Sequence, residues 1–200
     1  MQQMQVVRMK NSYFSFNEWL LILIFALCGA LMNLYLPLKS LLDGIDMTGP
    51  VKGMALFGGF FFVMWVYLGR KIIGKKYAGL TTAILLISFC LFLAPWYGIA
   101  SPSWFSLYGL LALLAVGAWV ELLFGKWDWV GGGLGNLFCL GITWFAFGFH
   151  RQIWAEAKQA PFSLLAAFIS GVAGVLLGRG IVKLISNLTI EPQIHTDERR

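Results

Sequence analysis

From residue 19 to residue 185 the chain alternates between long apolar stretches and short connections that are polar or rich in Gly and Pro. Each stretch is about 17 to 25 residues long, the length an α-helix needs to cross roughly 30 Å of hydrocarbon. Within a bilayer every backbone N–H and C=O must be paired inside its own segment, so such stretches are interpreted as membrane-spanning helices. Six spans are predicted, over residues 19–36, 53–69, 77–99, 104–124, 129–149 and 162–185.

The composition leaves little material for a soluble domain. Of the 200 residues 59% are hydrophobic and 12% are charged, with a mean hydropathy of +0.76, whereas a globular chain carries about 25% charged residues. We expect an all-α integral membrane protein, a multi-pass protein of the cell membrane. Its transmembrane domain covers residues 19–185, after a polar segment at residues 1–18 and before a polar tail at residues 186–200. The first apolar run has no small-residue cleavage pattern and is not interpreted as a signal peptide.

Lysine and arginine residues orient the predicted six-helix bundle. With the N-terminus in the cytoplasm, eleven of the fifteen Lys and Arg residues fall on the inner side, including the run Arg-Lys-Ile-Ile-Gly-Lys-Lys at residues 70–76. An excess of this kind in cytoplasmic loops is typical of membrane proteins. Both termini are therefore predicted to be cytoplasmic, with residues 37–52, 98–103 and 150–161 outside. Contact of the same basic residues with anionic membrane lipid explains the net charge of +6 without a nucleic-acid partner.

Motifs of enzyme chemistry are missing from the sequence. It contains neither HExxH nor GxSxG, and its two histidines, His150 and His195, have no nucleophile and acid at the same membrane depth. The three cysteines stand apart within predicted spans, without CxxC spacing, which favours small apolar packing over metal or redox chemistry. They are Cys28, Cys90 and Cys139. We therefore expect no enzyme activity, no bound metal and no cofactor.

Glu121 is the acid placed well inside an apolar stretch. An ionisable residue within the membrane is by default a hypothesis for a functional site. However, Glu121 lies about one turn from the inner end of its span, near Lys126, so snorkelling or a structural ion pair is an equally open interpretation.

Aromatic residues gather at the outer ends of the last four spans and in the loops between them. They are Trp96, Tyr97, Trp104, Tyr108, Trp144 and Trp154, accompanied by His150. One interpretation is an aromatic belt at the membrane interface. The other is a pocket, because flat heterocycles stack on aromatic rings while a few polar groups fix their orientation. In this second hypothesis Trp96, Trp104, Trp144 and His150 line an outer cavity, and Asp43 or Asp46 meets a polar edge of the ligand.

Small residues recur at helical spacing in two of the spans. Ala26 and Ala30 share one face of the first span, and small residues four apart allow another helix to approach closely. That helix belongs either to a partner or to this chain. The glycine-rich run at residues 131–135 opens the fifth span and indicates close helix packing or a flexible start. It is not a phosphate loop, because the Lys-Ser/Thr that would follow is missing.

These features together resemble the S-component, the substrate-binding subunit, of an energy-coupling factor (ECF) vitamin transporter. The shared features are about 200 residues, six helices with both ends inside, a long first outer loop and the small-residue face of Ala26 and Ala30. The stretch from Phe57 to Phe124 also resembles the hydroxymethylpyrimidine/thiamine branch of that family. The residues concerned are Phe57-Gly58-Gly59-Phe60, Gly69-Arg70-Lys71, Ala78-Gly79-Leu80 and Ala115-Val116-Gly117-Ala118 with Glu121.

The resemblance implies a subunit that captures a small, vitamin-like, heterocyclic substrate near the outer face. It would hand this substrate to a transmembrane coupling subunit with ATP-hydrolysing subunits, and Ala26 and Ala30 would dock the coupling subunit. The alternative function is a structural or assembly subunit of a larger membrane complex, with no ligand of its own.

Overall fold

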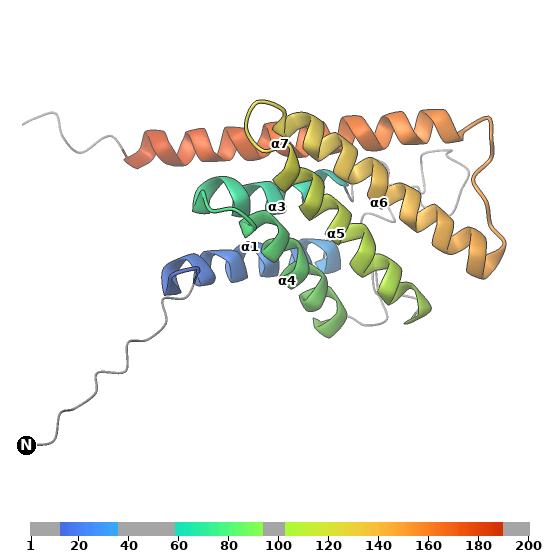
Figure 1. Ribbon diagram of the computed structural model, residues 1–200, viewed down its shortest axis with the longest axis horizontal. Coiled ribbons are helices and arrows are strands. Elements are labelled where there is room, and N and C mark those ends of the chain that lie inside the picture. The colour runs from blue at the N-terminus through green and yellow to red at the C-terminus, as the bar shows by residue number, and fades with distance from the viewer. Residues whose placement is uncertain (1–12, 36–58, 94–102, 190–200) are drawn as a thin grey trace, which may run out of the picture.

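Six α-helices account for most of the residues that the structure describes. The structure is a computed structural model, and it describes residues 13–35, 59–93 and 103–189. The helices are α1 (Phe16–Tyr35), α3 (Gly59–Ile73), α4 (Ala78–Leu93), α5 (Ser106–Leu122), α6 (Asp128–Arg151) and α7 (Ala160–Thr189), with a short 3₁₀ helix, η3 (Ser103–Phe105), before α5 (Figure 1). The predicted all-α fold class is confirmed.

Three of these helices are long and apolar enough to cross a membrane. They are α1, with 20 residues, α6, with 24, and the first 28 residues of α7. Helices α4 and α5 are apolar but shorter. The predicted spans over residues 77–99 and 53–69 each run partly outside the described residues. Helix lengths and composition are therefore those of a membrane-associated protein.

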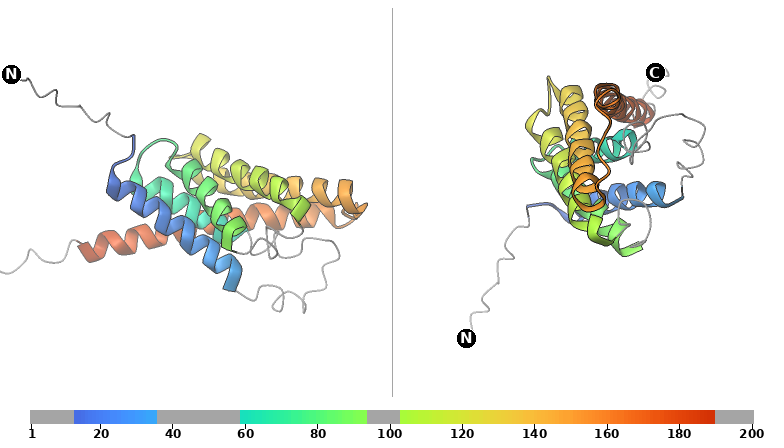
Figure 2. Two further views of the ribbon diagram at one scale, coloured as in Figure 1. Left: turned by 90° about the horizontal axis from the view of Figure 1, so that it is seen from below. Right: turned by 90° about the vertical axis from the view of Figure 1, so that its right-hand side faces the viewer.

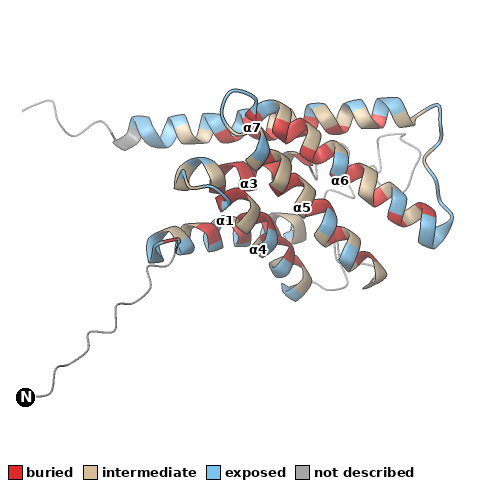
Figure 3. Ribbon diagram, viewed as in Figure 1, coloured by how far each residue is buried: buried red, intermediate tan, exposed pale blue. Residues whose placement is uncertain are grey.

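Helix α3 lies at the centre of the arrangement. It packs against α1, α4, α5, α6 and α7, and Figures 1 and 2 show it between α1 and α7. Eight of its 15 residues are buried, among them Phe62, Val63, Val66, Tyr67 and Leu68. The buried residues of the surrounding helices form stripes that face their neighbours (Figure 3), and the outward faces carry large apolar side chains. An apolar exterior of this kind suits a lipid environment.

The glycine run at residues 131–135 is a packing seam. It is fully helical and belongs to the first two turns of α6. A Cβ added to Gly131 would lie 2.7 Å from the carbonyl oxygen of Trp119 on α5, and one added to Gly135 would lie 3.1 Å from Cα of Val116. On the other side of α6, Gly132 lies against the backbone of Gly171 on α7. Glycine therefore lets three helix backbones approach one another, which is the role of small residues between packed membrane helices.

The start of α1 shows how the local sequence sets a helix boundary. The Ser15 N–H donates to the Glu18 carboxylate at 2.6 Å, and the Glu18 N–H donates to Ser15 Oγ at 3.4 Å. This reciprocal pair is a capping box, which satisfies two of the backbone donors at a helix N-terminus. It begins the helix three residues before the apolar stretch that predicted it.

Candidate functional site

An aromatic cluster joins η3, α5 and α6 at one end of the bundle. The indole ring of Trp104 and the imidazole ring of His150 are stacked, with centroids 4.4 Å apart and planes at 22°. Tyr108 Oη lies 3.1 Å from His150 Nε2, so the two groups share a hydrogen bond. Phe147 completes the cluster, its ring 5.4 Å from that of Trp104 and nearly perpendicular to it. We call Trp104, Tyr108, Phe147 and His150 the aromatic cluster.

Helical spacing brings these four side chains together. Tyr108 follows Trp104 by four residues and His150 follows Phe147 by three, so each pair lies on one face of the chain. The nearby Phe105 ring is buried and lies 5.6 Å from Phe147, which anchors the two elements to each other. His150, in contrast, is exposed. The cluster thus holds an imidazole in a fixed orientation at the surface, with a ring stacked on one side and a hydroxyl at its edge.

The structure brings together two of the predicted site residues, Trp104 and His150. Trp144 packs against Leu140 of α6 and Ala167 of α7, in a cluster that also includes Leu164 and Phe147. In the part of the chain that the structure describes, no ring contact joins Trp144 to the aromatic cluster. The three other predicted site residues, Asp43, Asp46 and Trp96, lie outside the described residues.

Tyr108 and Phe147 were not among the predicted site residues. The sequence places Tyr108 among the outer aromatics without indicating a role, and Phe147 is one of several phenylalanines in its predicted span. The signal available in the sequence was their spacing from Trp104 and His150, since residues three or four apart share a helix face.

The opposite end of the bundle carries ion pairs. Arg70 Nε of α3 donates to Glu121 Oε2 of α5 at 2.8 Å, and the Gly79 N–H of α4 donates to Glu121 Oε1 at 2.8 Å. Both charged side chains are nearly buried, with exposed fractions of 12% and 9%. The Arg70 guanidinium also lies over the Phe124 ring, 3.9 Å from its centroid. Glu121 therefore has a structural partner, and that partner is Arg70 instead of the nearby Lys126.

A second ion pair closes the same end on the side of α6 and α7. Asp128, buried in the first turn of α6, pairs with Arg179 of α7 and accepts a hydrogen bond of 3.1 Å from Tyr67 Oη of α3. A third pair joins Lys75 Nζ, in the α3–α4 turn, to the Glu18 carboxylate at 2.7 Å. We call this the ion-pair end. Its three pairs involve residues of α1, α3, α5, α6 and α7 and of the α3–α4 turn.

The two ends are far apart along α6. His150 follows Asp128 by 22 residues, which is about 33 Å at 1.5 Å per residue. That separation is close to the thickness of the hydrocarbon core of a bilayer, about 30 Å. Along α6 the aromatic cluster and the ion-pair end are therefore separated by about the thickness of one hydrocarbon core.

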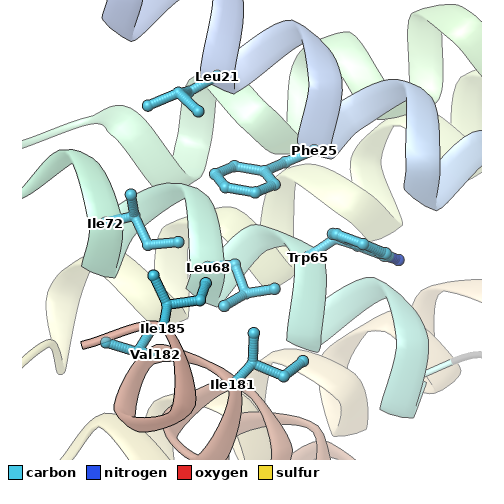
Figure 4. Close-up of a pocket in the computed structure, with 8 residues that line it drawn as sticks. All are labelled: Leu21, Phe25, Trp65, Leu68, Ile72, Ile181, Val182 and Ile185. Carbon is cyan, nitrogen blue, oxygen red and sulfur yellow. The ribbon is translucent and has the colours of Figure 1, made fainter. Parts of the chain in front are cut away.

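An apolar groove of about 350 Å³ runs between α1 and α7, near the ion-pair end. Its floor is α3, and its walls are α1 on one side and α7 on the other (Figure 4). All its lining residues are large and apolar: Leu21, Phe25, Trp65, Leu68, Ile72, Ile181, Val182 and Ile185.

Ala26 and Ala30 are buried inside the chain. Their exposed fractions are 0% and 2%, and both belong to the main core cluster with Leu86 of α4. Gly29, between them, is equally tight, since a Cβ there would lie 2.6 Å from Leu86 Cδ1. A partner helix has no access to this face in the structure. The two alanines therefore have an internal packing role, which is the alternative that the small-residue pattern left open.

Among the described residues, no group of three His, Cys, Asp or Glu side chains could hold a metal ion. The search of family models, of curated proteins and of solved structures gave no match to this chain.

Proposed function

We propose that this chain is the substrate-capturing membrane subunit of an ECF-type micronutrient importer, and that the aromatic cluster is its ligand site. The observation that carries the proposal is the stacked pair of Trp104 and His150, held by Tyr108 and exposed on the His150 side. Trp104 and Phe147 supply apolar ring surface, while His150 and Tyr108 supply polar edges. In the proposed complex a flat heterocyclic ligand stacks on these rings, and its polar atoms form hydrogen bonds with the imidazole. Asp43 and Asp46 stay predicted contributors from the first outer loop.

The proposed membrane arrangement is six spans with both termini in the cytoplasm. It is supported by the distribution of Lys and Arg, eleven of fifteen on the inner side. In this arrangement the ion-pair end faces the cytoplasm and the aromatic cluster faces outward. The captured ligand then passes to a transmembrane coupling subunit and its ATP-hydrolysing subunits.

Site-directed labelling tests this orientation. Single cysteines replace two exposed residues, Ala157 in the α6–α7 connection and Lys126 in the α5–α6 turn, in a background without the three native cysteines. A maleimide that cannot cross the membrane should label Ala157→Cys on intact cells and should leave Lys126→Cys unlabelled until the cells are opened. The reverse pattern contradicts the proposed orientation.

Binding measurements on tryptophan variants test the ligand site. Native mass spectrometry of the purified chain first identifies the small molecule that it retains, and the affinity for that molecule is then measured. Trp104→Ala should weaken binding by about 1–3 kcal/mol, the range found for aromatic–base stacking, which is about one to two decades in Kd. Trp119→Ala is the matched control, because Trp119 lies 11 residues along α5 from Tyr108 and its ring packs against Phe138 of α6, and it should leave the affinity unchanged.

Two results would contradict the proposal. If Trp104→Ala binds the molecule as tightly as the unaltered chain, the cluster belongs to an interfacial belt. If no small molecule is retained by the chain in cells grown on complete medium, the structural or assembly role becomes the better interpretation.

A further inference from the structure

The apolar groove between α1 and α7 has no role in the proposed substrate site. We propose that it holds one acyl chain of an anionic phospholipid from the inner leaflet, whose headgroup meets the lysines of the ion-pair end. The inference rests on the membrane orientation of the proposed function, and it does not depend on the aromatic cluster.

The size and the walls of the groove favour an acyl chain over a protein helix. A helix with its side chains is about 10–12 Å across, so three turns of it occupy more than ~1,000 Å³. This volume is several times the 350 Å³ of the groove. Helices that approach each other closely in membranes also need small residues at the contact. The groove is lined only by Leu, Ile, Val, Phe and Trp, whereas the small residues of α1 face the core.

The charges around the groove select an anionic headgroup. Each acid of the ion-pair end, Glu18, Glu121 and Asp128, already pairs with a cation. The lysines of this end for which the described residues provide no ion pair are Lys71, Lys76, Lys126 and Lys183.

Lys71 directly precedes Ile72, a residue of the groove floor. A lysine near the surface favours anionic lipid by about 1 kcal/mol, which is about fivefold in affinity. In the proposed complex a phosphate meets Lys71, whose Nζ lies 5.6 Å from the centroid of the Phe124 ring, while the acyl chain lies in the groove.

The experiment counts retained lipids. The full chain is reconstituted into vesicles with equal amounts of phosphatidylglycerol and phosphatidylcholine, re-extracted into mild detergent and examined by native mass spectrometry. The unaltered chain should retain one phosphatidylglycerol, preferred over phosphatidylcholine by about fivefold or more.

Two variants with matched controls locate the lipid. Val182→Trp fills the groove and should abolish retention of both lipids, whereas Leu184→Trp, on the exposed side of the same helix, should retain lipid as the unaltered chain does. Lys71→Gln should lower the preference for phosphatidylglycerol about fivefold. Lys126→Gln removes a charge in the α5–α6 turn, none of whose residues lines the groove, and should keep the preference.

Three outcomes would overturn the inference: equal retention by Val182→Trp and Leu184→Trp, equal retention of the two lipids by the unaltered chain, or a second copy of the chain in place of the lipid. If Val182→Trp does not fold, Leu21→Trp fills the same groove from α1 and gives the same test. Trp104→Ala should keep the lipid, so failure of the ligand site and failure of the lipid site can be told apart.

Discussion

Replacing Glu121 with Gln removes one charge of a nearly buried ion pair. Glu121 Oε2 accepts from Arg70 Nε, and Oε1 accepts from the Gly79 N–H, both at 2.8 Å. Glutamine keeps the shape and can still accept from Gly79, but its amide cannot compensate the Arg70 charge. Loss of one partner from a buried pair costs about 3–5 kcal/mol, since the remaining charge is left without compensation.

The size of the expected loss in unfolding free energy depends on the contacts that Arg70 keeps in the variant. Its side chain is 12% exposed, and its Nη1 is already buried without a hydrogen-bond partner, so water gives little relief. The Phe124 ring under the guanidinium keeps about 0.5–2 kcal/mol of cation–π attraction. We therefore expect a loss of about 3 kcal/mol, the lower end of the range for a buried pair. For a chain of this length that loss lowers Tm by about 6–12 °C.

Thermal unfolding of the purified protein in one detergent measures the effect. Glu156→Gln is the control, because Glu156 is an exposed acid in the α6–α7 connection, and its free energy of unfolding should change by less than about 0.5 kcal/mol. The double variant Arg70→Met with Glu121→Gln should recover part of the loss, since no buried charge is then left unpaired. The reasoning fails if Glu121→Gln unfolds at the same temperature as Glu156→Gln, or if the double variant loses the sum of the two single losses.

Two further predictions concern packing and the second ion pair. Gly171→Ala should destabilise the bundle, because its Cβ would meet the Gly132 carbonyl. Gly180→Ala, with open space around its Cβ, should stabilise α7 by about 0.5–1 kcal/mol; equal Tm changes for the two variants would contradict the packing seam. Tyr67→Phe should lower the free energy of unfolding by about 1–3 kcal/mol, because the hydrogen bond to buried Asp128 is lost; an unchanged Tm would show that this hydrogen bond does not contribute.

The apolar pattern was sufficient to predict the helices, and for a physical reason. A long apolar stretch that lies in lipid must pair its backbone groups within itself and therefore forms a helix, so the existence and the order of the helices follow from hydropathy. The boundary of α1 came earlier than predicted because a polar capping box, Ser15 with Glu18, begins the helix before the apolar residues do.

Long-range pairing was not predictable in the same way. Arg70 and Glu121 lie 51 positions apart, as do Asp128 and Arg179. The sequence indicates that Glu121 needs a cationic partner, but several lysines and arginines lie at the same depth. Which of them pairs with Glu121 depends on how each helix is rotated about its own axis. The nearest cation in sequence, Lys126, was a reasonable candidate and is not the partner.

The rotation of each helix about its axis also explains which of the predicted site residues lie side by side. Trp104 and His150, two of the predicted site residues, stack on each other because they stand at the ends of neighbouring elements, η3 and α6. Trp144 precedes His150 by six residues, which at 3.6 residues per turn puts it on a different side of α6, toward α7. Ala26 and Ala30 show the same limit, since a small-residue face looks alike whether it meets a partner or α4.

The ion-pair end has a consequence for the order in which the chain is made. Arg70 leaves the ribosome 51 residues before Glu121, a delay of about 3–10 s at about 5–20 residues per second. During that interval the guanidinium has no carboxylate, and Asp128 waits equally long for Arg179. Arg70 lies in the last turn of α3 and Asp128 in the first turn of α6, so in the proposed membrane arrangement each can stay in the aqueous boundary until its partner is synthesised. That arrangement allows α3 to be inserted before α5 supplies Glu121, and α6 before α7 supplies Arg179.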